Sequence, residues 1–163
     1  MKGMHKTGQQ LQRGFTLIEL IAVVVVLGVL AAIAVPRMVN LREAALISTT
    51  QQLKGQVSSA AHLVFAKAIT EGLHNQTSAS VLVNGISVDI AYGYPTGTAT
   101  GISRMVDYPP GDWNSRASVF SGAWVYWHGE LSEDAGVGQC YIRYRQSVAA
   151  GVGPVIDEVY SGC

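Results

Sequence analysis

Hydrophobic residues are distributed unevenly along this chain, and the longest apolar run lies near its start. Residues 15–35 include Glu19 as their only charged side chain. At 1.5 Å per residue, a helix of this length extends about 31 Å, which is enough to cross the hydrocarbon core of a bilayer. We therefore predict a transmembrane helix over residues 15–35, followed by the polar environment that begins around Arg37 and Arg42.

A second apolar pattern follows this run, and it has the period of a helix. Its members recur at spacings of three, four or seven residues: Leu46, Leu53, Val57, Ala60, Ala61, Val64 and Ala68. Such spacing places them on one face of an amphipathic helix. The pattern predicts one long helix from Phe15 to about Glu71, with Gly72 as its C-cap. Pro36 lies inside this helix and predicts a kink, because proline removes a backbone hydrogen bond.

After Gly72 the hydrophobic period changes from that of a helix to that of a strand. Residues 81–83 and 86–90 flank Asn84-Gly85, and this dipeptide favours the tight turn of a β-hairpin. Further strands are predicted over residues 119–127, 139–146 and 155–160. We expect Trp113, Trp124 and Trp127 to pack in the core of the sheet. A long helix followed by an antiparallel sheet is an α+β fold.

Charge divides the chain into two parts. Lys2, Lys6 and Arg13 precede Gly14 with no acidic residue among them, although the whole chain has a formal net charge of zero. The rest of the chain therefore carries a side-chain charge of about −3. The basic segment favours a cytoplasmic location for the N-terminal side of the apolar run, an asymmetry that the two later arginines weaken. An acidic body without a basic patch argues against nucleic acid as a partner.

Two cysteines are present, Cys140 and Cys163. In an exported protein, a single pair predicts one disulfide, which would stabilise the fold by about 3 kcal/mol in the chain-entropy model. In a reducing compartment the same residues would be two unpaired thiols.

Glu19 is the unusual residue of the apolar run, because a charge in the centre of a bilayer helix costs about 3 kcal/mol. One interpretation of the run is an ordinary signal peptide, with Ala32-Ile33-Ala34 as a small-x-small cleavage site. Another is a plain single-pass anchor, which accounts for the length of the run but leaves Glu19 without a role.

A third interpretation comes from a resemblance. Residues 14–20, Gly-Phe-Thr-Leu-Ile-Glu-Leu, stand behind a basic leader and resemble the class III signal of type IV prepilins and the related pseudopilins. Gly28 and Pro36 also match positions of that family. The resemblance implies that a prepilin peptidase cleaves after Gly14, which removes the leader 1–14, and that Phe15 becomes the N-methylated first residue.

The resemblance also gives Glu19 a role in assembly. Cleavage creates an α-ammonium on Phe15, and at about 4 Å such an ammonium attracts a carboxylate by about 4 kcal/mol at an effective dielectric of 20. In the family, the ammonium belongs to a neighbouring subunit of the filament. An ion pair within one chain, four residues apart, is the alternative.

A weaker resemblance extends over residues 36–72. Residues 36–41, 53–55 and 63–68 look like those of mannose-sensitive haemagglutinin (MSHA) type pilins, which form thin surface pili used in attachment and biofilm formation. The implied organisation is a leader (1–14), a transmembrane and assembly helix (15–35) and a pilin head (36–163). The implied partners are other pilin subunits and the inner-membrane assembly platform, and the implied location is the inner membrane before assembly and the cell surface afterwards.

No catalytic or cofactor-binding motif is recognised, so we expect a structural protein and not an enzyme. His62, His74 and His128 are scattered and lack zinc-like spacing. Glu130, Glu133 and Asp134 could offer oxygen ligands to calcium, but their spacing is not that of an EF-hand; we favour a solvated acidic turn and expect no metal.

Two other functions remain open at this point. The first is a pseudopilin of a type II secretion system, which has the same N-terminal signal and often relies on calcium instead of a disulfide. The second is an exported soluble binding domain with a conventional signal peptide, whose mature chain would begin near Val35.

Overall fold

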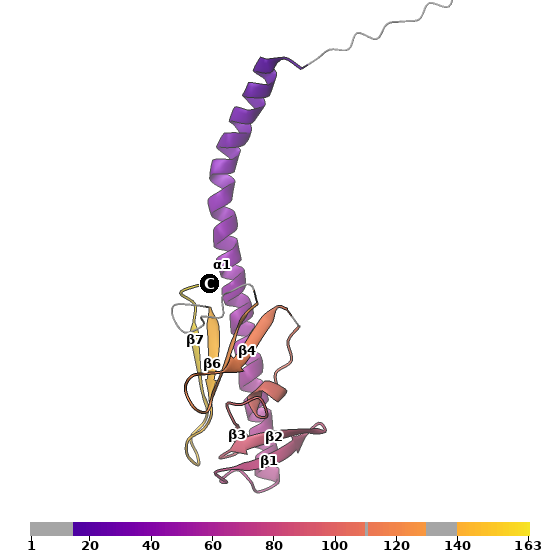
Figure 1. Ribbon diagram of the computed structural model, residues 1–163, viewed down its shortest axis with the longest axis vertical. Coiled ribbons are helices and arrows are strands. Elements are labelled where there is room, and N and C mark those ends of the chain that lie inside the picture. The colour runs from indigo at the N-terminus through magenta and orange to yellow at the C-terminus, as the bar shows by residue number, and fades with distance from the viewer. Residues whose placement is uncertain (1–14, 110, 130–139) are drawn as a thin grey trace, which may run out of the picture. The chain divides into compact units, whose positions relative to one another are not determined.

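The computed structural model describes residues 15–109, 111–129 and 140–163. Among these residues, one long helix is followed by seven strands and a single 3₁₀ turn, the α+β arrangement predicted from the sequence (Figure 1). The chain separates into two compact units, with the division between Leu41 and Arg42. Each unit is described by itself below.

Helix α1 comprises Leu17–Thr70 and ends in the way that the sequence predicts. Gly72 has a positive φ of 72°, a conformation that glycine adopts without steric cost. Its N–H donates to the carbonyl of Ile69 at 3.0 Å, and the N–H of Leu73 donates to the carbonyl of Ala68 at 2.8 Å. These two bonds form a Schellman motif, so the last carbonyls of the helix have partners and the chain turns towards the sheets.

The first sheet has three antiparallel strands in the order β1-β2-β3. Their bounds are Ala79–Val83 for β1, Ile86–Ala91 for β2 and Tyr94–Pro95 for β3. Asn84 and Gly85 connect the first two strands with φ values of 50° and 82°. Both angles are positive, as a type I′ turn requires, which confirms the predicted hairpin.

The second sheet has four antiparallel strands in the order β4-β5-β6-β7. Their bounds are Trp113–Ala117, Ala123–His128, Tyr141–Arg145 and Val155–Val159. The last two strands lie where the sequence predicts them. The strand predicted over residues 119–127 was wrong at its start, because β5 begins only at Ala123 and the residues before it form the loop from β4. Strand β4, in which Trp113 is the only buried residue, was not predicted.

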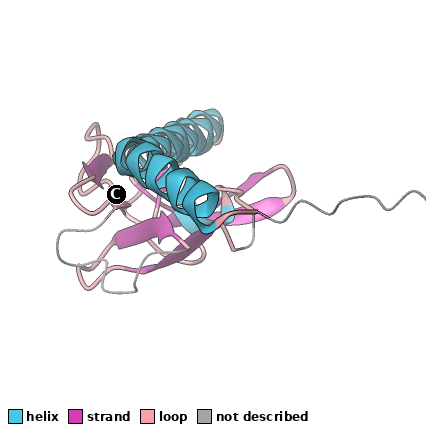
Figure 2. Cartoon of the chain, turned by 90° about the horizontal axis from the view of Figure 1, so that it is seen from above, coloured by secondary structure: helices cyan, strands magenta, loops and turns pink. Residues whose placement is uncertain are grey.

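The core lies between the C-terminal part of α1 and the two sheets, whose strands lie beside it (Figure 2). Leu53, Val57, Ala60 and Ala61 pack with the inner face of the four-stranded sheet, including Tyr126 and Tyr144. One and two turns further on, Val64 and Ala68 pack with the hairpin β1–β2. The predicted apolar face of the helix is therefore the buried face.

The four-stranded sheet also has an apolar cluster on its other face. Val125, Trp127 and Tyr141 are buried there and contact one another, with Val159 half-buried beside them. Trp113 and Trp124 belong to the main core, so all three tryptophans are buried, as predicted. Both faces of this sheet therefore hold large side chains in fixed positions.

A disulfide joins Cys140, immediately before β6, to Cys163. Cys140 is fully buried. Its sulfur lies 3.5 Å from the hydroxyl of Thr50, which is itself buried on α1 and donates to the carbonyl of Leu46 at 2.7 Å. The disulfide is thus packed against the helix as well as joining two segments of the chain.

Candidate functional site: the start of helix α1

The first turn of α1 is closed by Thr16 and Glu19. The backbone N–H of Thr16 and its hydroxyl both donate to the Glu19 carboxylate, at 2.9 and 2.8 Å, and the N–H of Glu19 lies 3.4 Å from the Thr16 hydroxyl oxygen. Since the helix begins at Leu17, Thr16 is its N-cap and Glu19 is the third helical residue. This reciprocal arrangement is a capping box.

The capping role of Thr16 was not predicted, although the sequence contains a pattern that indicates it. The spacing Thr-x-x-Glu before an apolar run is the sequence pattern of a capping box. A carboxylate in the first turn also interacts favourably with the positive end of the helix dipole. Glu19 therefore has a partner within its own chain while Phe15 is still joined to Gly14 by a peptide bond.

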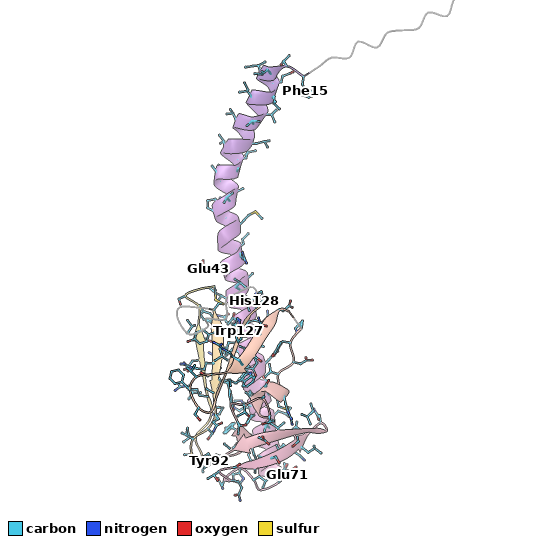
Figure 3. All side chains as sticks on the ribbon, in the orientation of Figure 1. Phe15, Glu43, Glu71, Tyr92, Trp127 and His128 are labelled. Atoms are coloured by element: carbon cyan, nitrogen blue, oxygen red, sulfur yellow. A yellow bond between two sulfur atoms is a disulfide. The ribbon has the colours of Figure 1, made fainter. Side chains whose placement is uncertain are left out.

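The apolar part of α1 exposes nearly all of its side chains. Phe15 is 90% exposed, and the large apolar residues between Leu17 and Val35 are between 49% and 75% exposed. Phe15 stands just before the first turn (Figure 3). Among the described residues, α1 is the one helix that is long and apolar enough to cross a membrane. Such a continuous apolar surface requires lipid or other protein to cover it.

Three other residues of the predicted signal and helix are Gly14, Gly28 and Pro36. Gly14 lies outside the described residues. Gly28 has open space where a side chain would stand, with nothing within 4 Å. Pro36 lies inside α1, which is helical on both sides of it. The kink expected at Pro36 stays a prediction.

The remaining predicted residues lie in the C-terminal unit, with the disulfide. His62 is exposed on α1, with Nδ1 2.7 Å from the carbonyl oxygen of Ser58, and His74 and His128 lie on other segments. Within the described ranges, no group of three or more His, Cys, Asp or Glu side chains is placed to hold a metal ion. The acidic residues considered as calcium ligands, Glu130, Glu133 and Asp134, lie outside the described residues.

Ion pairs hold the last strand in place. Lys54 on α1 contacts Glu158 on β7 at 2.6 Å, and its hydrogen bond lowers the pKa of that carboxyl group. On the other side of the strand, Asp157 accepts from Arg143 at 3.0 Å and pairs with Arg145 at 3.0 Å. Partial burial alone would raise the pKa of Asp157, but hydrogen bonds from the two arginines outweigh it, so the pKa is lowered.

Comparison with known proteins gives one match. Residues 10–35 match the family model described as the prokaryotic N-terminal methylation motif. No curated protein and no solved structure matches this chain significantly. The match includes Phe15, Thr16 and Glu19, so the capping box lies within the matched segment.

Fold and motif together support one class of protein. One long apolar N-terminal helix followed by antiparallel sheets matches the type IV pilin fold. The methylation motif at the start of that helix supports a type IV pilin-like precursor, and its apolar segment fits membrane anchoring before assembly.

Proposed function

We propose that this chain is a prepilin that is cleaved after Gly14, N-methylated on Phe15 and polymerised through the first half of α1 into a type IV pilus. The observation that carries this proposal is the methylation motif over residues 10–35. A prepilin peptidase cuts before the apolar helix, so the mature filament subunit keeps that helix. Cleavage of a conventional signal peptide would instead remove the apolar segment from the mature chain. Residues 1–14 would then be the leader, 15–35 the assembly helix and 36–163 the pilin head.

The exposed surface of α1 supports this proposal. The apolar side chains between Leu17 and Val35 are covered by no other part of the described chain. In the membrane, lipid covers them; in a filament, the same surface of neighbouring helices replaces the lipid. Because lipid is as apolar as these side chains, transfer into the filament depends on close helix packing and polar contacts. Glu19 is the one charged residue available for such a contact in this segment.

Cleavage changes the set of partners available to Glu19. Before cleavage, its carboxylate accepts from the backbone N–H and hydroxyl of Thr16. After cleavage, Phe15 carries a charged ammonium, which at about 4 Å attracts a carboxylate by about 4 kcal/mol at an effective dielectric of 20. We propose that the ammonium of one subunit pairs with Glu19 of its neighbour, so that processing by the prepilin peptidase precedes assembly.

Two variants and a charge control test this role. Glu19→Ala should leave cleavage intact and abolish or strongly reduce filaments, because the ammonium of the incoming subunit then has no carboxylate partner. Thr16→Ala removes only the cap, worth about 1 kcal/mol, and should retain filaments. Glu71→Ala removes a carboxylate at the other end of the same helix, where it pairs with Lys67 at 2.9 Å, and serves as the charge control.

Filaments are counted by electron microscopy, and mass spectrometry measures the extent of cleavage. Normal filaments from Glu19→Ala would refute the intersubunit pair. Equal loss of filaments from Thr16→Ala and Glu19→Ala would assign Glu19 a capping role only.

The pseudopilin function rests on the same motif, and one observation favours the pilus over it. The C-terminal unit contains the disulfide Cys140–Cys163, whereas pseudopilins of type II secretion systems often rely on bound calcium instead of a disulfide. We therefore expect that reductant destabilises the chain and that a chelator does not. The opposite result would favour the pseudopilin.

The finer proposal is a surface pilus of the MSHA type, used for attachment and biofilm formation. It is supported by the resemblance of residues 36–72 alone. Cells that lack this chain should lose extracellular filaments and attach poorly to surfaces. Loss of protein secretion with normal attachment would contradict the proposal.

A further inference from the structure

Strand β1 forms a free edge of the three-stranded sheet (Figure 1). The strand order β1-β2-β3 gives β1 one neighbour, β2, and leaves its other side without a strand among the described residues. Its sequence over Ala79–Val83 is Ala-Ser-Val-Leu-Val. An edge strand presents backbone N–H and C=O groups that can pair with another extended chain. The register of the hairpin identifies which of these groups are free.

Ser80 and Leu82 direct their backbone groups away from the hairpin. Ser80 lies opposite Asp89 in the register of β1 and β2. The N–H of Asp89 donates to the carbonyl of Thr100 at 3.0 Å, and its carbonyl accepts from the N–H of Thr96 at 2.9 Å, so both groups point away from β1. Ser80 and Asp89 are therefore a non-hydrogen-bonded pair of the antiparallel ladder, and the backbone groups of Ser80 point outward. Leu82, two residues further along the strand, has the same orientation.

The outward backbone groups of Ser80 and Leu82 have no hydrogen-bond partner within the described ranges. The side chains of both residues are also exposed, that of Leu82 to 57%. Val81 and Val83, which alternate with them, are buried in the core against α1. The core thus fixes the inner face of β1, while its edge offers unpaired donors and acceptors beside an exposed apolar side chain.

Strand β1 lacks the features that protect the other edges of the two sheets. Strand β3 has only two residues and includes Pro95. Strand β4 includes Arg116, and β7 includes Asp157 and Glu158. Short length, proline and charged side chains each hinder the pairing of an edge with another chain. Strand β1 has five residues, among them two valines and a leucine, and neither proline nor charge, which is the composition that favours pairing.

We propose that β1 pairs antiparallel with β1 of a second copy of this chain. Charge favours a second copy as the partner, because an uncharged strand meets an identical strand without repulsion between like charges. The contact is isologous, so each copy contributes the same surface. A two-fold axis at Val81 places Ser80 of one copy opposite Leu82 of the other. In this register every outward N–H and C=O of the two residues gains a partner.

The pairing joins the two three-stranded sheets into one continuous sheet across two copies. One short strand on each side buries less than the roughly 1,200 Å² of a stable interface, so we expect reversible association that strengthens where many copies are displayed together. In the pilus proposed above, a two-fold contact joins subunits of neighbouring filaments, because the subunits of one filament all point the same way. Pairing of two copies does not itself require polymerisation, so it can fail or succeed separately from the proposed pilus.

The test uses the full chain in a non-ionic detergent and two variants, Ser80→Cys and Leu82→Cys. Both positions are exposed, and the two native cysteines are joined to each other, so each variant has one free thiol. The variants are mixed in equal amounts and oxidised, and disulfide-linked dimers are identified by mass spectrometry. In the proposed register the two different cysteines lie directly opposite, with Cα atoms about 5.5 Å apart. Identical cysteines lie on a diagonal at about 7–8 Å, beyond the reach of an unstrained disulfide.

Mixed dimers should therefore exceed the two identical dimers together by at least about threefold, whereas random collision gives a ratio of about one. Adding Leu82→Lys to the Ser80→Cys chain should lower the yield of mixed dimers by at least about fivefold, because an edge lysine opposes strand pairing.

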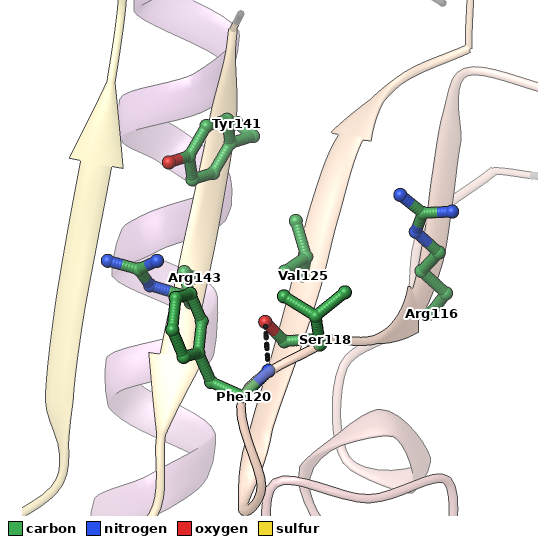
Figure 4. Close-up of a pocket in the computed structure, with 7 residues that line it drawn as sticks. Arg116, Ser118, Phe120, Val125, Tyr141 and Arg143 are labelled. Atoms are coloured by element: carbon green, nitrogen blue, oxygen red, sulfur yellow. Dashed lines mark hydrogen bonds between the residues drawn. The ribbon is translucent and has the colours of Figure 1, made fainter. Parts of the chain in front are cut away.

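Val119→Lys, added to the same Ser80→Cys chain, is the matched control. Val119 is 93% exposed and lies outside the three-stranded sheet, on the loop between β4 and β5. Figure 4 shows this loop, in which the N–H of Phe120 donates to the Ser118 hydroxyl at 3.3 Å. The control adds the same charge at an exposed apolar residue, and the yield of mixed dimers should stay within about twofold, since salt screens charges at a distance.

Three results would overturn the proposal. The first is an excess of mixed dimers below about threefold, or no linked dimers at all. The second is a loss of yield from Leu82→Lys that is no larger than the loss from Val119→Lys. The third is a disulfide that forms in cells between either cysteine variant and a different protein but not between copies, which would assign the edge to that protein.

Discussion

Removal of the Cys140–Cys163 disulfide should cause a large loss of stability in the C-terminal unit. The perturbation is the double variant Cys140→Ala, Cys163→Ala. Alanine is chosen because a serine at position 140 would place a hydroxyl where Cys140 is fully buried. Thr50 would keep its hydrogen bond to the carbonyl of Leu46, so the variant leaves no new polar group without a partner.

The expected magnitude follows from the separation of the two cysteines. They are 23 residues apart in the sequence. In the chain-entropy model, opening a loop of that length costs about 3 kcal/mol of stability, because the unfolded chain regains conformational freedom. The C-terminal unit comprises residues 42–163, and for a domain of that size the loss corresponds to a fall in unfolding temperature of about 10 °C.

Circular dichroism of the full chain in detergent measures this transition, with and without reductant. Reductant should lower the unfolding temperature of the unchanged chain to that of the double variant and should leave the double variant unaffected. An unfolding temperature of the double variant within about 2 °C of the unchanged chain would contradict a stabilising role of the disulfide. It would mean that packing around Cys140, not the cross-link, holds this segment.

Three further substitutions and one control, Leu63→Ala, test the packing and the charges. Leu53→Ala should cost about 3 kcal/mol in urea unfolding, because Leu53 is buried against the sheet, while the half-exposed Leu63→Ala should cost less than about 0.5 kcal/mol. Asp157→Asn should cost about 1 kcal/mol at pH 7. Since the folded-state pKa of Asp157 lies below its ordinary value of 3.8, this difference should be present above that value and vanish as the pH falls through the folded-state pKa. Gly93→Ala should cost more than about 1 kcal/mol, because Gly93 has a φ of 85° and a Cβ there would meet the Phe65 ring at 2.8 Å. Equal costs for the two leucines, a pH-independent effect at Asp157 or a neutral Gly93→Ala would each contradict the corresponding contact.

Local signals in the sequence predicted most of the fold. The helix face from Leu53 to Ala68, the Gly72 cap and the Asn84-Gly85 turn each depend on residues close together in the chain, and all three are present in the structure. Strand β4 was not predicted because its residues do not alternate between buried and exposed. Trp113 is its only buried residue, and the strand forms through its pairing with β5. Long-range pairing of this kind leaves no periodic trace in a polar segment.

The candidate site was predictable in its residues but not in its contacts. The motif around Phe15 and Glu19 is a sequence signal, and the comparison with known families found the same segment. The hydrogen bonds from Thr16 to Glu19 appear only in the structure, although the Thr-x-x-Glu spacing could have indicated them.

The intact mass of the mature protein shows whether the chain is processed as a prepilin. The chain is produced in cells that contain a prepilin peptidase, extracted from the membrane or from filaments and measured by mass spectrometry. We predict a chain that begins at Phe15 and carries one added methyl group. Its mass should be lower than that of the reduced chain by the two hydrogens lost when the Cys140–Cys163 bond forms. A chain that begins near Val35, or one that still carries residues 1–14, would contradict it.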